Sequence, residues 1–226
     1  MEQNLGYLKA KKFFNELNAP TYDLLVKFAT LGQDYYWKRK ILQKKISSTG
    51  LVLDLACGTG ILSSLLQKKG NIVFGIDLTY EYLKILKTKK PELFCINGIA
   101  EYLPFKNNCF DYIVSSYLPK YADLTNLVNE CFRVLKNGGK IILHDFIFPN
   151  RRIYQELWKI YFKILKKTGK LFFKDWSQVF NELDSLISTT DWYEILPKIL
   201  LNKGFIRITS ESLSMETSAI IYAKKP

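Results

Sequence analysis

The chain has 226 residues, of which 48% are hydrophobic and 24% charged, and its formal net charge is +12. This length suits one compact α/β domain, and the composition excludes a disordered or fibrous chain. No apolar run approaches the roughly 18 residues that span a bilayer. The N-terminal stretch lacks a continuous apolar signal core, so we expect a cytoplasmic protein.

The positive charge comes mainly from lysine and leaves three interpretations open: nucleic-acid binding, contact with an anionic membrane surface, or a lysine-rich solvated exterior. The cysteines lack Cys-x-x-Cys spacing, which favours a reduced protein without structural zinc. The chain has one histidine, and its acids are scattered, so we predict no metal site.

In chain order, residues 20–46 are predicted to form a helix with an apolar face from Leu24 to Leu31. Short apolar runs and helical segments then alternate up to residue 146. The predicted strands are 51–56, 71–77, 93–97, 110–116 and 140–146. The predicted helices between them are 61–69, 80–89 and 123–136. Because strands that alternate with helices need crossover connections, this pattern predicts a parallel sheet covered on both faces.

The pattern changes after Pro149. Helices are predicted at 151–167, about 175–187 and 192–202, followed by two strands at 205–212 and 218–225. These strands are joined by a short connection and are therefore antiparallel. We predict a Rossmann-like α/β fold whose seven-stranded, mostly parallel sheet ends in an antiparallel hairpin and carries an inserted helical cap. The expected parts of this single domain are an N-terminal helical lid (1–46), a cofactor-binding core (47–148), the cap (149–202) and the hairpin (203–226).

The first cap helix has two contrasting sides. One side carries large apolar residues, namely Tyr154, Trp158, Tyr161 and Leu165. The other side carries basic residues, namely Arg152, Lys159, Lys163, Lys166, Lys167 and Lys170. A basic stripe opposite an aromatic face fits a helix at a membrane surface. It fits equally an ordinary cap whose aromatic residues cover the active site.

A glycine turn between a predicted strand and a predicted helix carries the main functional signal. The segment 54–60 reads Asp-Leu-Ala-Cys-Gly-Thr-Gly, and glycine lets the backbone adopt positive φ and approach a nucleotide. Ser63 stands where a dinucleotide fold has its third glycine, and Asp54 would repel a pyrophosphate. An acid at Asp54 instead suits an ammonium and a sulfonium group, and Asp77, at the end of the next strand, can pair with ribose hydroxyls. The pattern predicts S-adenosylmethionine as cofactor; the alternative is that both acids only cap turns.

Four segments within residues 51–146 resemble the ordered motifs of class I methyltransferases: VLDLACGTG, FGIDLT, AEYLPFKNNCFDYIVSS and FRVLKNGGKIIL. The resemblance implies that the segment around Ala100 holds the adenine. Because Ile99 replaces the usual polar residue there, main-chain groups near Ala100 are expected to make the adenine contacts. The expected cofactor-binding residues are Asp54, Ala56, Cys57, Gly58, Thr59, Gly60, Asp77, Leu78, Ile99, Ala100 and Ser115.

A narrower resemblance covers nearly the whole chain. The segments APTYDLL (19–25), LGQDYYWKRK (31–40) and FIFP (146–149), with the aromatic stretch that leads to KGF (203–205), are similar to the C-methyltransferases of ubiquinone and menaquinone biosynthesis. Those enzymes methylate a ring carbon of a prenylated quinol precursor, so the resemblance implies a lipophilic ring acceptor such as a demethylmenaquinone-like quinol. Lys120 falls near an arginine of that family, and lysine does not reproduce a bidentate guanidinium.

Methyl transfer from a sulfonium is an in-line displacement in which the protein mainly positions donor and acceptor. Attack by a ring carbon gains from an ionised ring hydroxyl, so a base or a water held by polar groups is expected. The candidates at the carboxyl ends of the strands are Ser115, Ser116, Lys120, His144 and Asp145. Tyr22 would join them from the N-terminal lid. For each, the alternative is a structural role, such as packing for His144 and Tyr22 or capping for Asp145.

We therefore predict an S-adenosylmethionine-dependent methyltransferase that C-methylates a hydrophobic ring compound; peripheral membrane contact through the cap stays open. Two other functions stay open. An RNA (tRNA) methyltransferase is permitted by the positive charge, although the chain lacks an appended RNA-binding module. A non-catalytic, cofactor-binding partner subunit is permitted by the departures at Ile99 and Lys120. The oligomeric state is left open.

Overall fold

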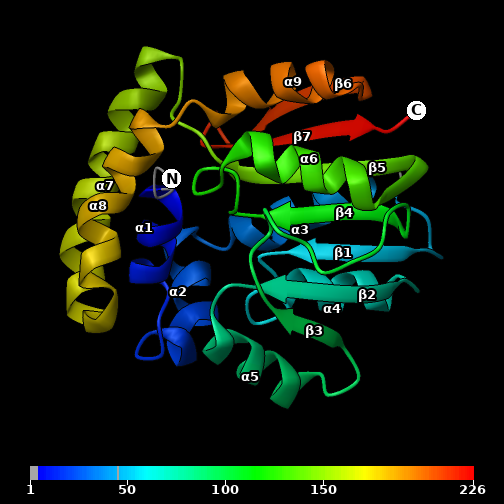
Figure 1. Cartoon of the computed structure of the whole chain (residues 1–226). Coiled ribbons are helices and arrows are strands. Elements are labelled where there is room, and N and C mark those ends of the chain that lie inside the picture. The colour runs from blue at the N-terminus through cyan, green and yellow to red at the C-terminus, as the bar shows by residue number, and fades with distance from the viewer. Residues whose placement is uncertain (1–4, 45) are drawn as a thin grey trace.

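The computed structural model describes residues 5–44 and 46–226, and within them seven strands form one sheet in the order β3-β2-β1-β4-β5-β7-β6 (Figure 1). The strands are β1 (Leu51–Leu55), β2 (Ile72–Asp77), β3 (Phe94–Asn97), β4 (Phe110–Ser116), β5 (Leu135–Phe146), β6 (Ile206–Leu213) and β7 (Ser218–Lys224). Strands β1 to β5 pair in parallel, and β7 runs antiparallel to both β5 and β6. The predicted parallel sheet with a C-terminal antiparallel hairpin is confirmed.

Helices follow most strands, as the crossover pattern predicts. The α-helices of the described residues are α1 (Leu5–Phe13), α2 (Tyr22–Ala29), α3 (Gln33–Gln43), α4 (Ile61–Lys68), α5 (Tyr80–Lys89), α6 (Leu124–Val134), α7 (Arg152–Phe172), α8 (Ser177–Thr189) and α9 (Trp192–Lys203). Two short 3-10 turns, at Ala19–Thr21 and Lys174–Trp176, lead into α2 and α8.

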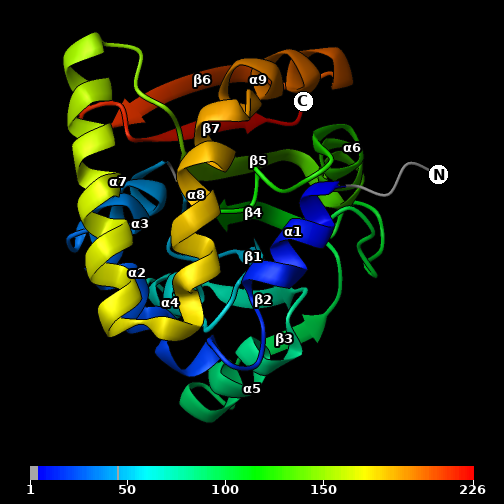
Figure 2. The same cartoon turned by 90° about the vertical axis from the view of Figure 1, so that its left-hand side faces the viewer.

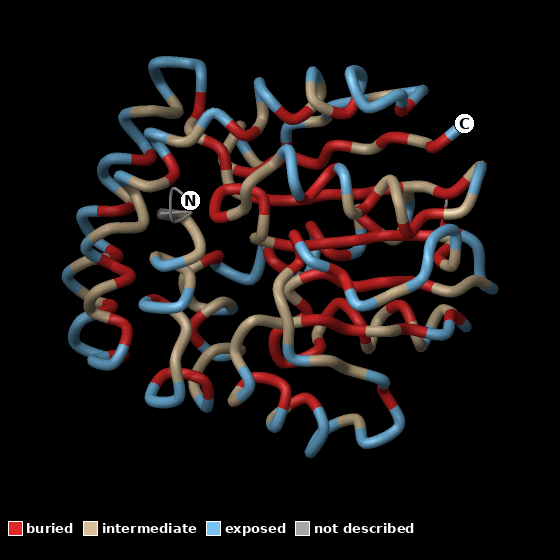
Figure 3. Tube along the Cα trace, viewed as in Figure 1, coloured by how far each residue is buried: buried red, intermediate tan, exposed pale blue. Residues whose placement is uncertain are grey.

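The sheet is buried on both faces because successive strand residues point to opposite sides. In β1, Val52 packs in one apolar cluster with side chains of α3 and α4, whereas Leu53 packs in another with side chains of α6 and α9. Buried residues accordingly run along the central strands, and the exposed ones lie mainly on the outer helices (Figure 3).

Helices α7 and α8 form a hairpin that stands, with α1 and α2, across the carboxyl ends of the parallel strands (Figures 1 and 2). These helices share an apolar cluster of their own, built around residues such as Leu25, Trp158, Phe162 and Trp176. Helix α9 returns to the sheet, where Leu196 packs in the same cluster as α6. Within the segment predicted as the cap, only α7 and α8 therefore leave the sheet.

Two predicted helices differ from the structure. The single helix predicted for 20–46 is wrong, because Leu31 (φ 51°) and Gly32 (φ 77°) adopt left-handed backbone and separate α2 from α3. Leu24 and Leu31 are exposed and do not form a buried face; position 45 of that stretch and the first four residues of the chain lie outside the described residues. The helix predicted for 123–136 ends at Val134, because the next residue already pairs with β4.

Both edges of the sheet are irregular or short. Strand β3 at one edge has 4 residues. Strand β6 at the other edge has a shifted register between Ile206 and Thr209, and Arg207 within that interval has φ 54°. An extra residue of this kind kinks the strand and leaves its ladder of hydrogen bonds incomplete.

Candidate active site

The turn after β1 is shaped by left-handed backbone. Ala56, Gly58 and Gly60 have φ values of 54°, 55° and 83°, a region that glycine enters without steric cost. A Cβ added at Gly60 would lie 2.9 Å from Cγ of Leu86 on α5, so a side chain there would collide with the Leu86 side chain. The turn delivers the chain into α4 and leaves its main-chain N–H groups at the carboxyl end of β1, where α/β sheets bind ligands.

Asp77, at the end of β2, holds this turn. Its two carboxylate oxygens accept hydrogen bonds from the N–H groups of Gly58 and Thr79, both at 2.8 Å. Burial raises the pKa of Asp77 to about 6, although both hydrogen bonds oppose that rise. A carboxylate oxygen has more than one lone pair, so Asp77 retains the capacity to accept bonds from a ligand.

Asp54 lies deeper, with 1% of its surface exposed, and accepts a 2.5 Å hydrogen bond from Oγ of Ser63. Burial raises the pKa of Asp54 to about 7, and the hydrogen bond from Ser63 opposes the rise. The Asp54 side chain lines a small cavity together with Lys38, Cys57 and Thr59. This carboxyl group is poised to ionise when a cation approaches.

Lys120 and Asp145 form a buried ion pair at the ends of β4 and β5. Nζ of Lys120 lies 2.6 Å from Oδ1 of Asp145, and it also donates to the carbonyl of Tyr117 at 3.0 Å. Burial lowers the pKa of Lys120 and raises that of Asp145, while their mutual attraction opposes both shifts. The ammonium lies 4.4 Å from the ring centroid of Tyr121, so a cation sits against aromatic faces beside the glycine turn.

His144 is enclosed within the sheet. Its Nδ1 is 2.9 Å from Oγ of Ser116 and its Nε2 is 2.6 Å from Oγ of Ser218 on β7. It has no exposed surface, and burial holds its pKa well below the usual histidine value. The Ser115 hydroxyl is also already hydrogen-bonded, because it donates to the carbonyl of Leu55 at 2.7 Å. Neither side chain lines the small cavity at Asp54 or the two cavities described next.

The N-terminal helices cover the glycine turn. Tyr22 of α2 lines a cavity of about 90 Å³ that it shares with Gly58 and Asp77. Asp23, next to it, accepts a hydrogen bond from the hydroxyl of Thr59 and pairs with Lys89 of α5. Small-molecule pockets usually enclose about 300–1,000 Å³, so this cavity is smaller than a typical nucleoside site.

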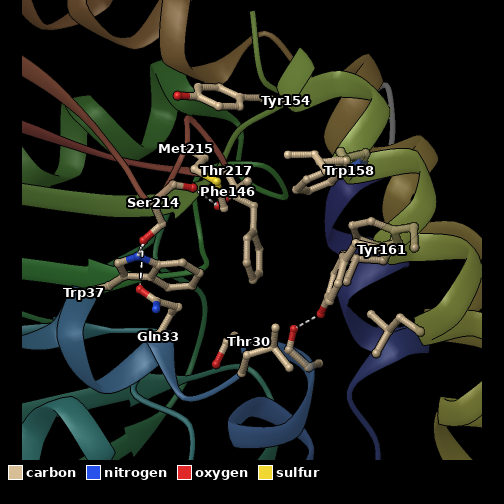
Figure 4. Close-up of a pocket in the computed structure, with 16 residues that line it drawn as sticks. Thr30, Gln33, Trp37, Phe146, Tyr154, Trp158, Tyr161, Ser214, Met215 and Thr217 are labelled. Carbon is tan, nitrogen blue, oxygen red and sulfur yellow. Dashed lines mark hydrogen bonds between the residues drawn. The ribbon is translucent and has the colours of Figure 1, made fainter. Parts of the chain in front are cut away.

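A larger cavity, of about 380 Å³, lies between α2, α3, α7 and the β6–β7 turn (Figure 4). Its walls are mostly apolar or aromatic and include Ala29, Leu31, Trp37, Phe146, Tyr154, Leu157, Trp158, Tyr161, Phe162, Leu165, Leu183 and Met215. Three of its polar side chains are bonded to one another: Nε1 of Trp37 donates to Ser214 at 2.8 Å, and Ser214 donates to Gln33 at 3.0 Å. The ring of Phe146 stacks on Tyr117 at 4.9 Å, and this pair separates the apolar cavity from the glycine turn.

The structure brings many of the sequence-predicted residues together. Tyr22, Ala56, Gly58, Asp77 and Leu78 line one cavity. Lys120 and Asp145 lie beside it. Ile99 and Ala100 follow β3 at the same edge of the sheet, and Ala100 is buried. The turn therefore gathers acidic side chains and main-chain groups at one end of the sheet, and such groups can accept hydrogen bonds and attract a cation.

Sequence reasoning missed several residues of this region. Tyr121 and Phe14 line the cavity with Tyr22, and Met215 of the β6–β7 turn lines the apolar cavity. Tyr121 follows Lys120 directly, so its position in the loop after β4 was a usable signal. No sequence signal pointed to Phe14 or Met215, because the segment after α1 and the β6–β7 turn reach the site only through tertiary packing.

Three comparisons bear on this geometry. The sequence profile of the ubiE/COQ5 methyltransferase family matches residues 2–225. A demethylmenaquinone methyltransferase of Chlorobaculum tepidum is 32% identical, with 95% of this chain and 91% of that protein covered. A ubiquinone/menaquinone biosynthesis C-methyltransferase UbiE of a Shewanella species is 31% identical, with 84% of this chain and 80% of that protein covered.

Solved structures share the fold. A candidate S-adenosyl-L-methionine-dependent methyltransferase from Methanococcus maripaludis superposes with a TM-score of 0.70 at 20% identity, covering 100% of this chain and 98% of that one. The geranyl diphosphate C-methyltransferase of Streptomyces coelicolor, solved with S-adenosyl-L-homocysteine, gives 0.63 at 13% identity, covering 85% and 79%. With this sheet order, glycine turn and family profile, the chain belongs to the ubiE/COQ5 methyltransferase family and is an S-adenosylmethionine-dependent methyltransferase.

Proposed function

We propose that the enzyme methylates a ring carbon of a prenylated quinol of the demethylmenaquinol type. The observation that carries this proposal is the apolar cavity of about 380 Å³ behind Phe146 and Tyr117. An apolar pocket with few polar groups suits a hydrocarbon chain better than a charged or strongly polar acceptor. The names of the two relatives agree with such an acceptor.

In this proposal, S-adenosylmethionine supplies an electrophilic methyl group when it binds at the glycine turn. Asp77 accepts hydrogen bonds from the ribose hydroxyls, and Asp54 lies where it attracts the positively charged end. Main-chain groups of the turn and of the Ile99–Ala100 segment hold the remaining polar atoms. The two acids thereby fix the methyl group at the carboxyl ends of β1 and β4, where the acceptor ring must meet it.

The acceptor side of the reaction falls to Tyr22, Lys120 and Asp145. Lys120 and Asp145 hold a cation near the acceptor's ring oxygen and favour the ionised hydroxyl. Tyr22, on the covering helix, completes the wall of the site and excludes water. His144 acts indirectly, because its hydrogen bond to Ser116 fixes the position of the end of β4.

Residues 1–46 serve as a lid in this proposal. Helix α2 contributes Tyr22 to the cofactor side, and its last residue, Ala29, lines the apolar cavity. The contacts of Asp23 with Thr59 and Lys89 fasten the closed position. Opening α1 and α2 admits the cofactor, and closing them shields the reacting atoms.

Acceptors with a prenyl chain should react with a lower KM than acceptors without one. Each methylene buried in the apolar cavity contributes about 0.8 kcal/mol, or about fourfold in affinity. The measurement is transfer of labelled methyl groups to demethylmenaquinols of different chain lengths, with transfer RNA as the competing class. Methylation of RNA in the absence of quinol methylation would show that the proposed acceptor class is wrong.

A surface beside the cavity favours membrane contact. The outer side of α7 does not carry basic residues alone. Its exposed apolar residues form a stripe, namely Ile153, Leu157, Ile160, Ile164 and Leu171. The exposed residues Leu31, Leu157 and Met215 belong both to the surface and to the cavity wall, so the cavity opens next to this stripe. No helix of the described residues is long and apolar enough to cross a bilayer.

We infer that the α7 stripe lies on an anionic bilayer, with lysines beside the stripe paired to lipid headgroups. Replacing Lys163, Lys167 and Lys170 with glutamine should lower binding to anionic vesicles strongly at low salt, because each basic residue contributes about 1 kcal/mol near the surface. The attraction fades over a Debye length of about 10 Å at 0.1 M salt. Vesicle flotation measures the bound fraction.

The matched control is glutamine at Lys106, Lys198 and Lys203, which are exposed and lie outside α7. This variant has the same net charge as the test variant and should bind vesicles nearly as well as the unmodified protein. If the unmodified protein stayed in solution with anionic vesicles, α7 would be a cap helix without a membrane role. The cofactor affinity should be unchanged in both variants.

A further inference from the structure

A buried hydroxyl beside the glycine turn lacks a protein partner. Tyr121 lies in the loop between β4 and α6 with 5% of its surface exposed, and its phenolic oxygen makes no hydrogen bond to the described residues. An unsatisfied buried polar group costs about 1–3 kcal/mol, so its presence calls for an explanation. Tyr121 also lines the cavity that contains Asp77 and Tyr22.

Two neighbouring hydroxyls on the same cavity are already paired. The hydroxyl of Tyr82 donates to Asn18 at 3.0 Å, and that of Ser116 is 2.9 Å from Nδ1 of His144. Burial, with the nearby Asp145 and Tyr22, raises the pKa of Tyr121 well above the usual value, so its hydroxyl keeps its proton. The ammonium of Lys120 lies against the Tyr121 ring. A neutral donor next to a buried cation suits an oxygen that carries negative charge.

We propose that the Tyr121 hydroxyl donates a hydrogen bond to the ring oxygen of the acceptor, ortho to the carbon that receives the methyl group. This inference rests on the proposed function. The ring centroids of Phe13 and Phe14 lie 6.3 and 5.8 Å from that of Tyr121, so the donor lies on an aromatic surface that suits a flat ring.

The Tyr121 hydroxyl would act in the first two steps of methyl transfer. The acceptor's hydroxyl loses its proton to water, and the resulting negative charge on oxygen is stabilised by Tyr121 and by the cation of Lys120. The ring carbon then forms a bond to the methyl carbon while the sulfur–methyl bond breaks and its electron pair stays on sulfur. The proton on that ring carbon finally leaves to water and restores the aromatic ring. Tyr121 lowers the cost of the first step and fixes the ring for the second.

The test is Tyr121→Phe. We expect kcat/KM for a demethylmenaquinol to fall by about tenfold or more, because a hydrogen bond to a charged oxygen is lost. The pH profile of kcat/KM should also shift to higher pH, because the acceptor hydroxyl ionises less readily without this hydrogen bond. The affinity for S-adenosylhomocysteine should stay within about twofold. The free energy of unfolding should be unchanged or higher, because the variant removes a hydroxyl that has no partner.

Tyr112→Phe is the matched control. The hydroxyl of Tyr112 accepts a bond from the N–H of Ser47 at 3.0 Å, away from the carboxyl ends of the strands. This variant should lose stability and keep its activity, which is the reverse of the pattern expected for Tyr121→Phe.

Three results would overturn the role of Tyr121: unchanged quinol methylation, weakened cofactor binding (which would assign the hydroxyl to the cofactor's carboxylate), or a loss of stability that accounts for the lost activity. If the unmodified protein methylated no quinol, the proposed function would fall together with this inference. If the unmodified protein methylated the quinol and Tyr121→Phe did so equally well, only the role of Tyr121 would be contradicted.

Discussion

Replacing Asp77 with alanine should weaken S-adenosylmethionine binding by about 1.5–3 kcal/mol, or about 10- to 150-fold in Kd. The variant removes a carboxylate that accepts bonds from Gly58 and Thr79 and that we propose binds the ribose hydroxyls. Titration calorimetry measures the affinity. Alanine at Asp191, an exposed acid at the start of α9, controls for the change in net charge and should leave the affinity unchanged.

Loss of the ribose contact must be separated from disorder of the glycine turn. An S-adenosylhomocysteine analogue without ribose hydroxyls should bind the unmodified protein weakly, and Asp77→Ala should weaken its binding little further. If the variant weakened both ligands equally, Asp77 would act only by holding the turn. An affinity for S-adenosylmethionine within about twofold of the unmodified protein would contradict the ribose assignment.

The affinity of the unmodified protein should also depend on pH. Burial places the pKa of Asp77 at about 6 and that of Asp54 at about 7. A cationic ligand favours the ionised acids and lowers both pKa values. Below pH 6 the acids are largely protonated, so binding must release protons and is weaker; above pH 7 both are ionised and binding is strongest. Calorimetry in two buffers of different ionisation enthalpy measures the released protons.

Replacing Lys120 with methionine should lower the free energy of unfolding by about 3–5 kcal/mol, because it leaves the buried carboxylate of Asp145 without its counter-charge. The two side chains are 2% and 0% exposed, so solvent screens the pair little. Denaturant unfolding measures the change. Single domains are stable by about 5–15 kcal/mol, so this one substitution removes a large part of the total.

Two variants control this experiment. Lys136→Met breaks an exposed pair with Asp111 and should change the stability by less than about 1 kcal/mol. Combining Lys120→Met with Asp145→Asn removes both charges, so much of the lost stability should return. A Lys120→Met protein as stable as the unmodified one would mean that Asp145 is protonated in the native state.

The strands and the glycine turn could be predicted from the sequence because each depends on local chemistry. Apolar runs of strand length mark β1, β2 and β4, and the glycines of segment 54–60 serve a turn that needs left-handed backbone. The pattern also predicted the helix that became α9. It did not show that this helix packs on the sheet, because Leu196 would be equally apolar in a cap.

Other features depend on partners far away in the sequence. The hydrogen bond of His144 to Ser218 joins residues 74 positions apart, so composition and spacing gave no sign that the ring is enclosed. The apolar stripe on α7 went unrecognised because Ile160 and Ile164 each follow a lysine directly in the sequence. Only the packed structure shows which side of the helix is outward. The unpaired hydroxyl of Tyr121 is likewise a property of packing, since the same residue at the surface would be bonded to water.

The edges of the sheet bear on how the protein behaves at high concentration. An exposed edge strand offers unpaired N–H and C=O groups, and a second copy can add its own edge strand to them and begin a growing assembly. Here β3 offers only 4 residues at one edge, and the shifted register near Arg207 interrupts β6 at the other. Neither edge therefore offers a second copy a long, regular row of unpaired N–H and C=O groups. The sheet resists edge-to-edge aggregation without a helix that covers its edges.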